Sequence, residues 1–214
     1  MWQNRVVLVL VVVFGAGFRF SKATMHRIEF EDDEVYSECP NQPSNVLNVS
    51  GLMNLSELTI DSQVGQMQIS GNLTMQWDIQ KSDRIQVILG GTLELFKFER
   101  REWVPTIYKI ATPDFCPLLY DENQYWYKLW VQHIVNIDEI RDKCLNVPGT
   151  KMIHKTFNLN TEFDILMGNF EGLHKLRVEL KAFDKQNKQR PTAICCEFVI
   201  NFYKTHKRIP AIHH

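Results

Sequence analysis

The 214-residue chain lacks an excess of charge of either sign, because 24 Lys and Arg residues stand against 25 Asp and Glu residues. Nothing in this balance favours nucleic acid as a partner. The chain also lacks an apolar run of roughly 20 residues, the length that a transmembrane helix needs. Its run from Val6 to Phe18 is well short of that length. The sequence therefore predicts neither a nucleic-acid partner nor an integral membrane span.

Known signatures of catalysis are missing as well. The chain has no G-x-S-x-G elbow, no H-E-x-x-H pair, no glycine-rich phosphate loop and no G-x-G-x-x-G turn. Its seven histidines are scattered or terminal, and only the terminal pair His213 and His214 has a spacing that suits metal ligands. We therefore expect no catalytic residue, no cofactor and no metal site, in a protein that is not an enzyme.

The N-terminus has the features of a secretory signal peptide. Arg5 supplies a positive charge, the apolar run follows it, and Ser21 and Ala23 are small residues at the spacing that signal peptidase prefers. Residues 1–23 are therefore the expected signal peptide. The mature protein is expected to be secreted and extracellular.

Sequons and cysteines agree with secretion. Three N-x-S/T sequons begin at Asn48, Asn54 and Asn72, which are the expected N-glycosylation sites and should be exposed. The chain has five cysteines, and in an oxidising compartment most of them should pair and leave one over. None belongs to a C-x-x-C motif, which argues against a zinc site.

Much of the chain after residue 66 alternates between apolar and polar residues with a period of two. Leu73, Met75 and Trp77 alternate with Thr74 and Gln76, as in a half-buried strand. Similar patterns occur over residues 84–98, 103–110, 157–165, 176–182 and 194–202. An aromatic-rich insert over residues 112–143 breaks the alternation, and its i, i+3 and i+4 spacings favour a short helix.

Strands spaced in this way favour two sheets that bury their apolar faces on each other. The expected fold is all-β, an immunoglobulin-like β-sandwich or β-cup with a short helical insert. Residues 24–205 are the expected domain. Residues 206–214 are expected to form a basic, flexible tail.

Several short motifs resemble those of a known family. They are residues 69–79 (Ile-Ser-Gly-Asn-Leu-Thr-Met-Gln-Trp-Asp-Ile), Trp103-Val104-Pro105-Thr106, Asp114-Phe115-Cys116, Cys144 followed by Pro148-Gly149-Thr150, and Cys195-Cys196. Over residues 30–205 the chain resembles the insect CheB chemosensory proteins. These are similar to the ganglioside activator protein and to other lipid-recognition (ML-like) β-sandwich proteins.

The resemblance implies an apolar cavity within the sandwich and no catalytic residue. It implies a secreted carrier of a hydrophobic ligand, a lipid or a pheromone like a cuticular hydrocarbon, that acts in contact chemosensation. A chemosensory receptor or ion channel is then a candidate protein partner. The alternative is an extracellular receptor-interaction or adhesion domain without a ligand cavity, which a glycosylated sandwich alone would satisfy.

The candidate walls of the cavity are apolar strand residues of suitable parity: Leu73, Met75, Trp77, Leu95, Phe157, Leu159, Phe163, Leu176, Val178, Leu180, Phe198 and Ile200. The insert supplies a candidate rim or lid in Tyr125, Trp126, Leu129 and Trp130. An ordinary packed core would have the same pattern. The sequence leaves both interpretations open.

Two disulfides are expected. Cys116 and Cys144 flank the insert and form the first. Cys39 is expected to tie the N-terminal strand to the last strand through Cys195 or Cys196. Adjacent strand residues face opposite ways, so only one of these two suits a fixed partner. Cys195 is favoured, because Cys196 lies on the apolar face and can behave as a small hydrophobic residue.

Overall fold

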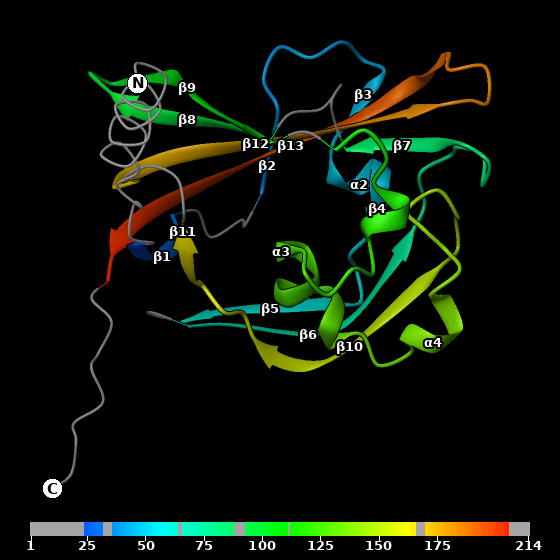
Figure 1. Cartoon of the computed structure of the whole chain (residues 1–214), viewed down its shortest axis with the longest axis horizontal. Coiled ribbons are helices and arrows are strands. Elements are labelled where there is room, and N and C mark those ends of the chain that lie inside the picture. The colour runs from blue at the N-terminus through cyan, green and yellow to red at the C-terminus, as the bar shows by residue number, and fades with distance from the viewer. Residues whose placement is uncertain are drawn as a thin grey trace, which may run out of the picture.

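The computed structural model describes residues 24–31, 36–63, 66–87, 93–110, 112–165 and 170–205. The expected signal peptide and the expected basic tail lie outside these residues. The described part is all-β, as the alternation predicts, with two sheets and a few short helices. Figure 1 shows the two sheets as an upper and a lower layer.

The larger sheet has nine strands in the described part of the chain. Its centre is formed by two long strands, β12 (Gly172–Phe183) and β13 (Gln189–Lys204). The path through the sheet is β11 (Glu162–Ile165), β1 (Thr24–Phe30), β13, β12, β8 (Leu93–Glu99) and β9 (Glu102–Ile110). Three short strands complete it: β2 (Ser37–Glu38) and β3 (Val46–Leu47) on β13, and β7 (Arg84–Val87) on β12.

The smaller sheet has four described strands. They are β10 (Lys151–Asn158), β6 (Gln66–Met75) and β4 (Met53–Asn54) in this order, with β5 (Leu58–Gln63) also paired to β6. A short helix, α2 (Val49–Leu52), connects β3 to β4. The described strand pairs run antiparallel apart from β3 with β13.

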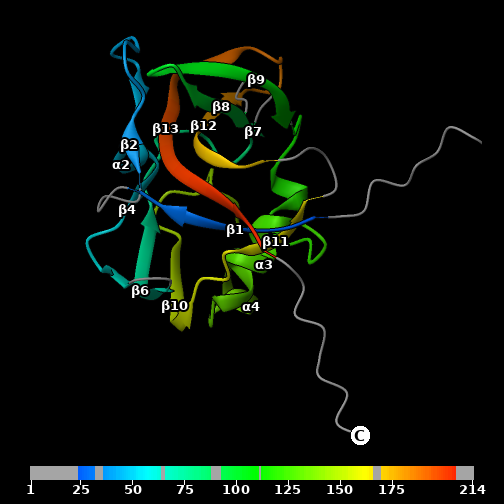
Figure 2. The same ribbon diagram turned by 90° about the vertical axis from the view of Figure 1, so that its left-hand side faces the viewer.

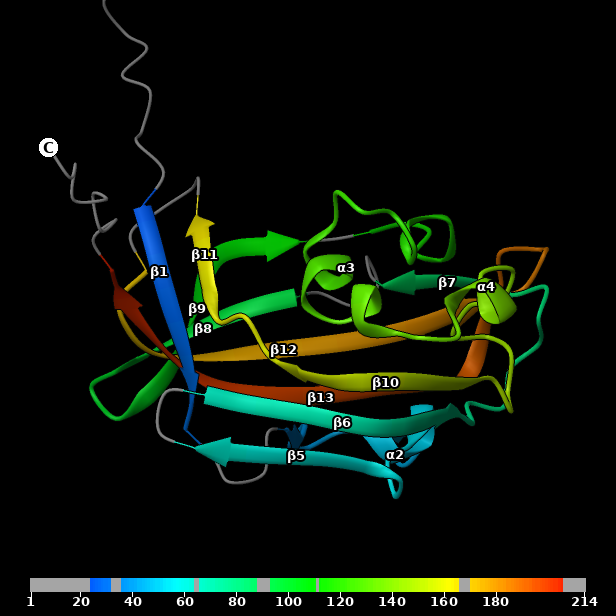
Figure 3. The same ribbon diagram turned by 90° about the horizontal axis from the view of Figure 1, so that it is seen from below.

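The inner face of the larger sheet follows from the alternation in its two long strands. The register pairs Leu176 with Phe198 and Leu180 with Ile194, so these apolar side chains share one face. Figure 3 shows β6 and β10 lying across β12 and β13. Leu180 and Ile194 accordingly pack in one core with Leu73 of β6. The even-numbered side chains of β12 and β13 therefore point between the sheets.

Trp77 marks a difference between the alternation and the strand. The apolar alternation continues to Ile79, and both residues are buried, but the hydrogen-bonded ladder of β6 ends at Met75. Trp77 is fully buried, and its indole Nε1 donates a hydrogen bond to Thr192 Oγ1 at 3.1 Å. The side-chain period therefore continues past the end of the strand because the core, and not a partner strand, holds this segment.

Residues 112–143 form the expected helical insert between β9 and β10. Its helices are η1 (Cys116–Leu118), α3 (Tyr125–Leu129), η2 (Val131–His133) and α4 (Ile137–Ile140). The aromatic stretch predicted as helical is divided at Trp130, which ends α3 and precedes η2. The insert lies at one side of the sandwich, and Figure 2 shows β2 and α2 at the opposite side.

Two disulfides join distant parts of the chain. Cys39 and Cys195, 156 residues apart, form what we call the strand bridge. Cys116 and Cys144, 28 residues apart, form the insert bridge. These pairings agree with the expected ones, and the structure resolves the choice between Cys195 and Cys196. Cys196 is free and buried.

The apolar pattern over residues 157–165 is interrupted at Thr161, and the structure divides the segment near this point, because β10 belongs to the smaller sheet and β11 to the larger one. The chain crosses between the sheets near Asn160, whose side-chain oxygen accepts a hydrogen bond from the backbone of Glu162 at 3.0 Å. Such a local bond favours a turn over a continued strand. Residues 46–63, for which the alternation makes no prediction, contain β3, α2, β4 and β5.

Candidate functional site

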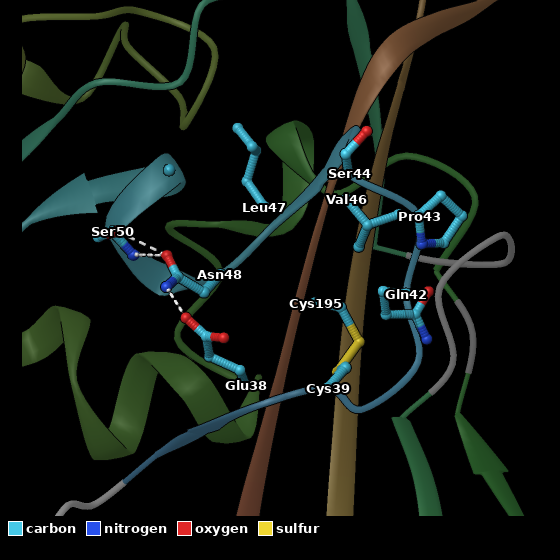
Figure 4. A pocket seen from close by; sticks show the side chains of 11 residues that line it. Glu38, Cys39, Gln42, Pro43, Ser44, Val46, Leu47, Asn48, Ser50 and Cys195 are labelled. Carbon is cyan, nitrogen blue, oxygen red and sulfur yellow. Dashed lines mark hydrogen bonds between the residues drawn. A yellow bond between two sulfur atoms is a disulfide. The ribbon is translucent and has the colours of Figure 1, made fainter.

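The structure has a surface pocket of about 400 Å³ beside the strand bridge, as Figure 4 shows. Its walls come from residues 38–51 and from Cys195 on β13. None of the candidate wall residues of the expected apolar cavity lines this pocket. The elements that carry most of its walls, β2 and α2, lie away from the helices of the insert in Figure 2.

The polar groups of this pocket bind one another. Asn48 caps α2, and its Oδ1 accepts a hydrogen bond from the backbone N–H of Ser50 at 3.0 Å. The Asn48 amide also donates to Glu38, as the dashed lines in Figure 4 indicate. Gln42 and Ser44 extend the polar wall, and Pro43, Val46 and Leu47 supply a smaller apolar part. This mixed, open wall is less suited to an alkyl chain than an enclosed apolar cavity.

Part of the expected cavity wall is packed core. Leu73, Met75, Trp77 and Leu180 are at most 5% exposed and belong to one cluster that joins both sheets, which we call the joint core. Trp126 and Trp130 of the insert pack against the same cluster. At these positions the structure has the packed core that the sequence left open as an alternative.

The opposite end of the sandwich is arranged differently. Here the larger sheet has its own cluster, which we call the β13 cluster, formed by Phe170, Ile200 and Phe202 with Ile28, Phe30, Leu176 and Phe198 against it. The smaller sheet also has its own, the β6 cluster, formed by Met67, Ile69 and Phe157 with Phe30, Leu58, Ile60, Trp130 and Leu159 against it. Phe30 packs against both. The apolar faces of the two sheets therefore do not merge into one cluster at this end.

Inner-face residues at this end are also incompletely covered. Leu176, Val178 and Phe198 are only half-buried, although their register places them on the same face as the buried Leu180 and Ile194. Val178 lies between the joint core and the β13 cluster and belongs to neither. The two sheets thus share one packed core at one end, whereas at the other end part of the inner apolar face of the larger sheet is incompletely covered.

Four candidate wall or rim residues remain to be considered: Leu95, Tyr125, Leu129 and Phe163. Leu129 of α3 is half-buried. Leu95 pairs with Leu176 in the strand register, and Phe163 pairs with His26. The side chains of Leu95, Tyr125 and Phe163 lie outside the part that the structure describes, so these three candidates stay predictions.

A buried histidine on β10 is a feature that the strand pattern did not reveal. His154 is 5% exposed and its ring centroid is 4.7 Å from that of Trp130. Neither of its ring nitrogens has a hydrogen-bond partner among the described residues. Burial, and to a lesser degree the neighbouring His133, lower the pKa of His154 to about 4. The sequence signal that could have revealed its burial is its position, because Met152 and His154 are two residues apart and both face inward on β10.

His133 lies beside this residue. Its ring stacks on Phe157, with 3.8 Å between centroids and planes that are 9° apart. Its Nδ1 is buried without a hydrogen-bond partner among the described residues, while its Nε2 is 3.4 Å from the exposed amide of Gln132. Burial, followed by the charge of Lys155, lowers the pKa of His133. One edge of this imidazole therefore faces solvent and the other faces the interior.

A second pair of buried histidines lies in the β13 cluster. His26 and His174 are at most 2% exposed and contact the rings of Phe170 and Phe202. Nδ1 of His174 is 2.8 Å from the Gly172 carbonyl oxygen, to which it can donate. Burial lowers the pKa of His174 against the opposing effect of this hydrogen bond. His174 is thus a polar residue that the core accommodates by giving it a partner.

The outer face of the larger sheet carries a shielded ion network. Glu197 is 4% exposed, and its carboxylate binds Lys175 Nζ at 3.0 Å and Arg177 Nε at 2.7 Å. Lys175 Nζ also lies 5.5 Å and 5.1 Å from the ring centroids of Phe96 and Trp103. Every charge here has a partner, which is the arrangement that makes buried ions tolerable. The network is therefore structural in character.

The three sequon asparagines differ in their surroundings. Asn54 is exposed. Asn48 and Asn72 are half-buried, and their amide groups donate hydrogen bonds to Glu38 and Glu57. Full exposure therefore holds only for Asn54.

The described residues also bear on metal binding and on membrane insertion. Across the described ranges, no three His, Cys, Asp or Glu side chains gather into a group that could hold a metal ion. No described helix has the length and apolar character needed to cross a bilayer. In comparisons with known proteins, no protein-family model matches the chain, and no curated protein matches it either.

Proposed function

We propose that the protein is a secreted, extracellular binder of a hydrophobic, lipid-like ligand, which lies between the sheets beside the β13 and β6 clusters. One observation carries this proposal. At this end each sheet keeps its own apolar cluster, and Leu176, Val178 and Phe198 on the inner face are only half-buried. A greasy surface that the fold leaves partly uncovered is what an insoluble guest would cover.

The energetics of such a guest are favourable. Burying one methylene group contributes about 0.8 kcal/mol, so a chain of about ten methylenes contributes about 8 kcal/mol before the costs of association. Trp130 packs against both the joint core and the β6 cluster. The insert that carries it is therefore suited to cover the ligand from the side, as the expected rim or lid.

The biological setting follows from the chain's other features. Two disulfides suit an oxidising, extracellular compartment. The resemblance to the CheB chemosensory proteins extends the proposal to contact chemosensation, with a pheromone like a cuticular hydrocarbon as ligand. A chemosensory receptor or ion channel would then receive the loaded protein.

Mass spectrometry of the secreted protein tests the proposal. The protein is purified from culture medium, extracted with organic solvent, and the extract is searched for copurified lipid. Leu176→Trp should fill the space and remove most of this lipid. The matched control is Val104→Trp on β9, where the native side chain is 42% exposed. Wild-type protein free of extractable lipid, and unable to take up an added long-chain alkane, would refute the proposal.

A second candidate function rests on the β8–β9 hairpin. Phe98 and Val104 are 40% and 42% exposed on neighbouring strands, next to the turn formed by Arg100 and Arg101. An exposed aromatic and basic hairpin suits a receptor-interaction or adhesion domain. Loss of binding to chemosensory cells in Phe98→Ser, with lipid uptake unchanged, would favour this function.

A further inference from the structure

His154 is a buried hydrogen-bonding group without a described partner at a place where the proposed ligand would lie. On the inner side of β10 it stands between Met152, which belongs to the joint core, and Phe157, which belongs to the β6 cluster. Only 5% of its surface is exposed, and both of its ring nitrogens lack a hydrogen-bond partner among the described residues. Leaving such groups unpaired costs free energy that a suitable ligand atom would recover.

The ring of His154 is surrounded by backbone and apolar groups. Its cross-strand neighbour on β6 is Gly71, and the position of the missing side chain is filled by the Glu57 carbonyl oxygen. On its other side it forms an isolated bridge with Ile134, next to His133. The Trp130 ring, 4.7 Å away between centroids, and the Phe157 ring, 6.2 Å away, supply apolar surfaces. The surroundings thus combine flat apolar walls with ring nitrogens that can donate or accept.

His133 is a second imidazole, which lies beside His154 and nearer to solvent. Its inner Nδ1 is buried without a partner among the described residues, while its outer Nε2 approaches the exposed Gln132. Its ring is held in place by stacking on Phe157. The two imidazoles therefore lie between the surface beside η2 and the buried inner side of β10.

We propose that His154, with His133 beside it, anchors the polar head of the ligand, which is a long-chain amphiphile with an uncharged hydroxyl or carbonyl oxygen rather than a pure hydrocarbon. This inference rests on the proposed function, because it assigns the chemistry of the same ligand. A neutral imidazole carries one N–H donor and one nitrogen acceptor, and a hydroxyl group can satisfy either.

The electrostatics of the site favour an uncharged head. The pKa of His154 is lowered to about 4, mainly by burial, so the ring is neutral near pH 7. Because burial penalises the charged form of this ring, it would also penalise a carboxylate or phosphate placed beside it. An alcohol, an ester or a protonated acid meets the site without that cost.

Competition binding tests the inference with two probes of equal chain length. Delipidated wild-type protein is loaded with a fluorescent hydrophobic dye, which is displaced by 1-hexadecanol or by hexadecane. In His154→Phe the affinity for hexadecanol should fall about tenfold, the equivalent of one lost hydrogen bond. The affinity for hexadecane should change little. His154→Gln, which keeps a donor and an acceptor, should retain most of the preference for the alcohol.

Thr150→Val is the matched control, because Thr150 is as buried as His154 but its Oγ1 already donates a hydrogen bond to the Val147 carbonyl, away from the proposed ligand. This variant should leave both affinities unchanged. Near-ultraviolet circular dichroism verifies that each variant is folded, and the ring ¹⁵N shifts of His154 should move when hexadecanol is added to wild type. This last measurement needs no variant.

The outcomes separate the two proposals. If wild type binds both probes but His154→Phe affects them equally or not at all, and the His154 ring shifts do not move, the head-group assignment is overturned while the lipid-binding function stands. If wild type binds neither probe nor the dye, both proposals fail. If the affinity for hexadecanol differs among the variants as expected while the affinity for hexadecane does not, the assignment of His154 to the polar head is supported.

Discussion

Acidification should destabilise the ligand-free protein through His154. In the folded state the pKa of His154 is lowered to about 4 by burial, whereas an unfolded chain leaves histidine near 6.5. A depressed histidine pKa means that the unfolded state binds a proton first. The contribution of neutral His154 to the free energy of unfolding is therefore fully present above about pH 6.5 and is lost as the pH falls toward 4.

The size of the effect follows from the shift. The difference between a pKa of about 4 in the folded state and about 6.5 in the unfolded state corresponds to about 3 kcal/mol in total. Between pH 7.5 and pH 4.5 the contribution of His154 to the free energy of unfolding should fall by about 2.5 kcal/mol. Carboxyl groups whose pKa is lowered in the folded state, such as that of Asp83 beside Arg190, also begin to lose stability near pH 4.5, so only the difference between wild type and His154→Phe isolates the part due to His154. His133 and His174, whose pKa values are lowered as well, should add to the loss.

Urea unfolding followed by tryptophan fluorescence measures this loss in delipidated protein at pH 7.5, 6.5, 5.5 and 4.5. His154→Phe should retain the fold and lose about 2.5 kcal/mol less than wild type over the range. At pH 7.5 the variant should be no less stable than wild type, because it removes two buried nitrogens without a described partner. A ring titration by NMR gives the pKa directly.

A His154 ring that titrates near pH 6.5 would contradict this prediction. Equal losses of stability in wild type and His154→Phe between pH 7.5 and 4.5 would contradict it as well. Either result would mean that the imidazole can be protonated in the folded state without penalty, and hence that water or a polar group reaches it.

Three further predictions concern the fold. Gly71→Ala should destabilise the protein by about 3 kcal/mol in urea unfolding, because Gly71 has a φ of 99° and a Cβ there would lie 2.1 Å from the Glu57 carbonyl oxygen. Gly149→Ala, with a φ of 81° but nothing within 4 Å, should cost only about 1 kcal/mol, and equal costs would contradict the steric argument. Replacing the strand bridge by two alanines should cost about 5 kcal/mol and replacing the insert bridge about 3.5 kcal/mol, since they span 156 and 28 residues; the reverse order in denaturant midpoints would rule out loop length as the cause. Glycosidase treatment and mass spectrometry of the secreted protein should find Asn54 more fully glycosylated than the two half-buried sequon asparagines, and an unmodified Asn54 would show that exposure does not decide occupancy.

Long amphipathic strands were the part of the fold that the sequence could predict. The alternation from Leu176 to Ala182 and from Ile194 to Phe202 identifies β12 and β13 and the face that each turns inward. The same parity argument favoured Cys195 over Cys196 for the strand bridge. Long strands are predictable because one buried face repeats every second residue. The segment 46–63 has strands of only two to six residues, which are too short to show that period.

For the candidate site, the sequence could predict only which side of each strand faces inward. Alternation places Leu180 and Leu176 on the same side of β12, but it does not say which part of the opposite sheet approaches each of them. Leu180 is buried in the joint core, whereas Leu176 is half-buried against the β13 cluster. His154 was missed because a polar residue at an inward position of β10 reads as an interruption of the pattern. Its meaning depends on Trp130 and Phe157, which reach it from other parts of the chain.

The last strand sets a limit on when the larger sheet can assemble. β13 pairs with β1, β2, β3 and β12, and three of these strands precede it by more than a hundred residues. A ribosome must therefore finish nearly the whole chain before the N-terminal strands find their neighbour, and their edges stay unpaired throughout synthesis. Contacts of such long sequence separation make folding slow, and exposed edges invite aggregation meanwhile. Chaperones that hold the nascent N-terminal half should therefore govern how much of this protein a cell can produce.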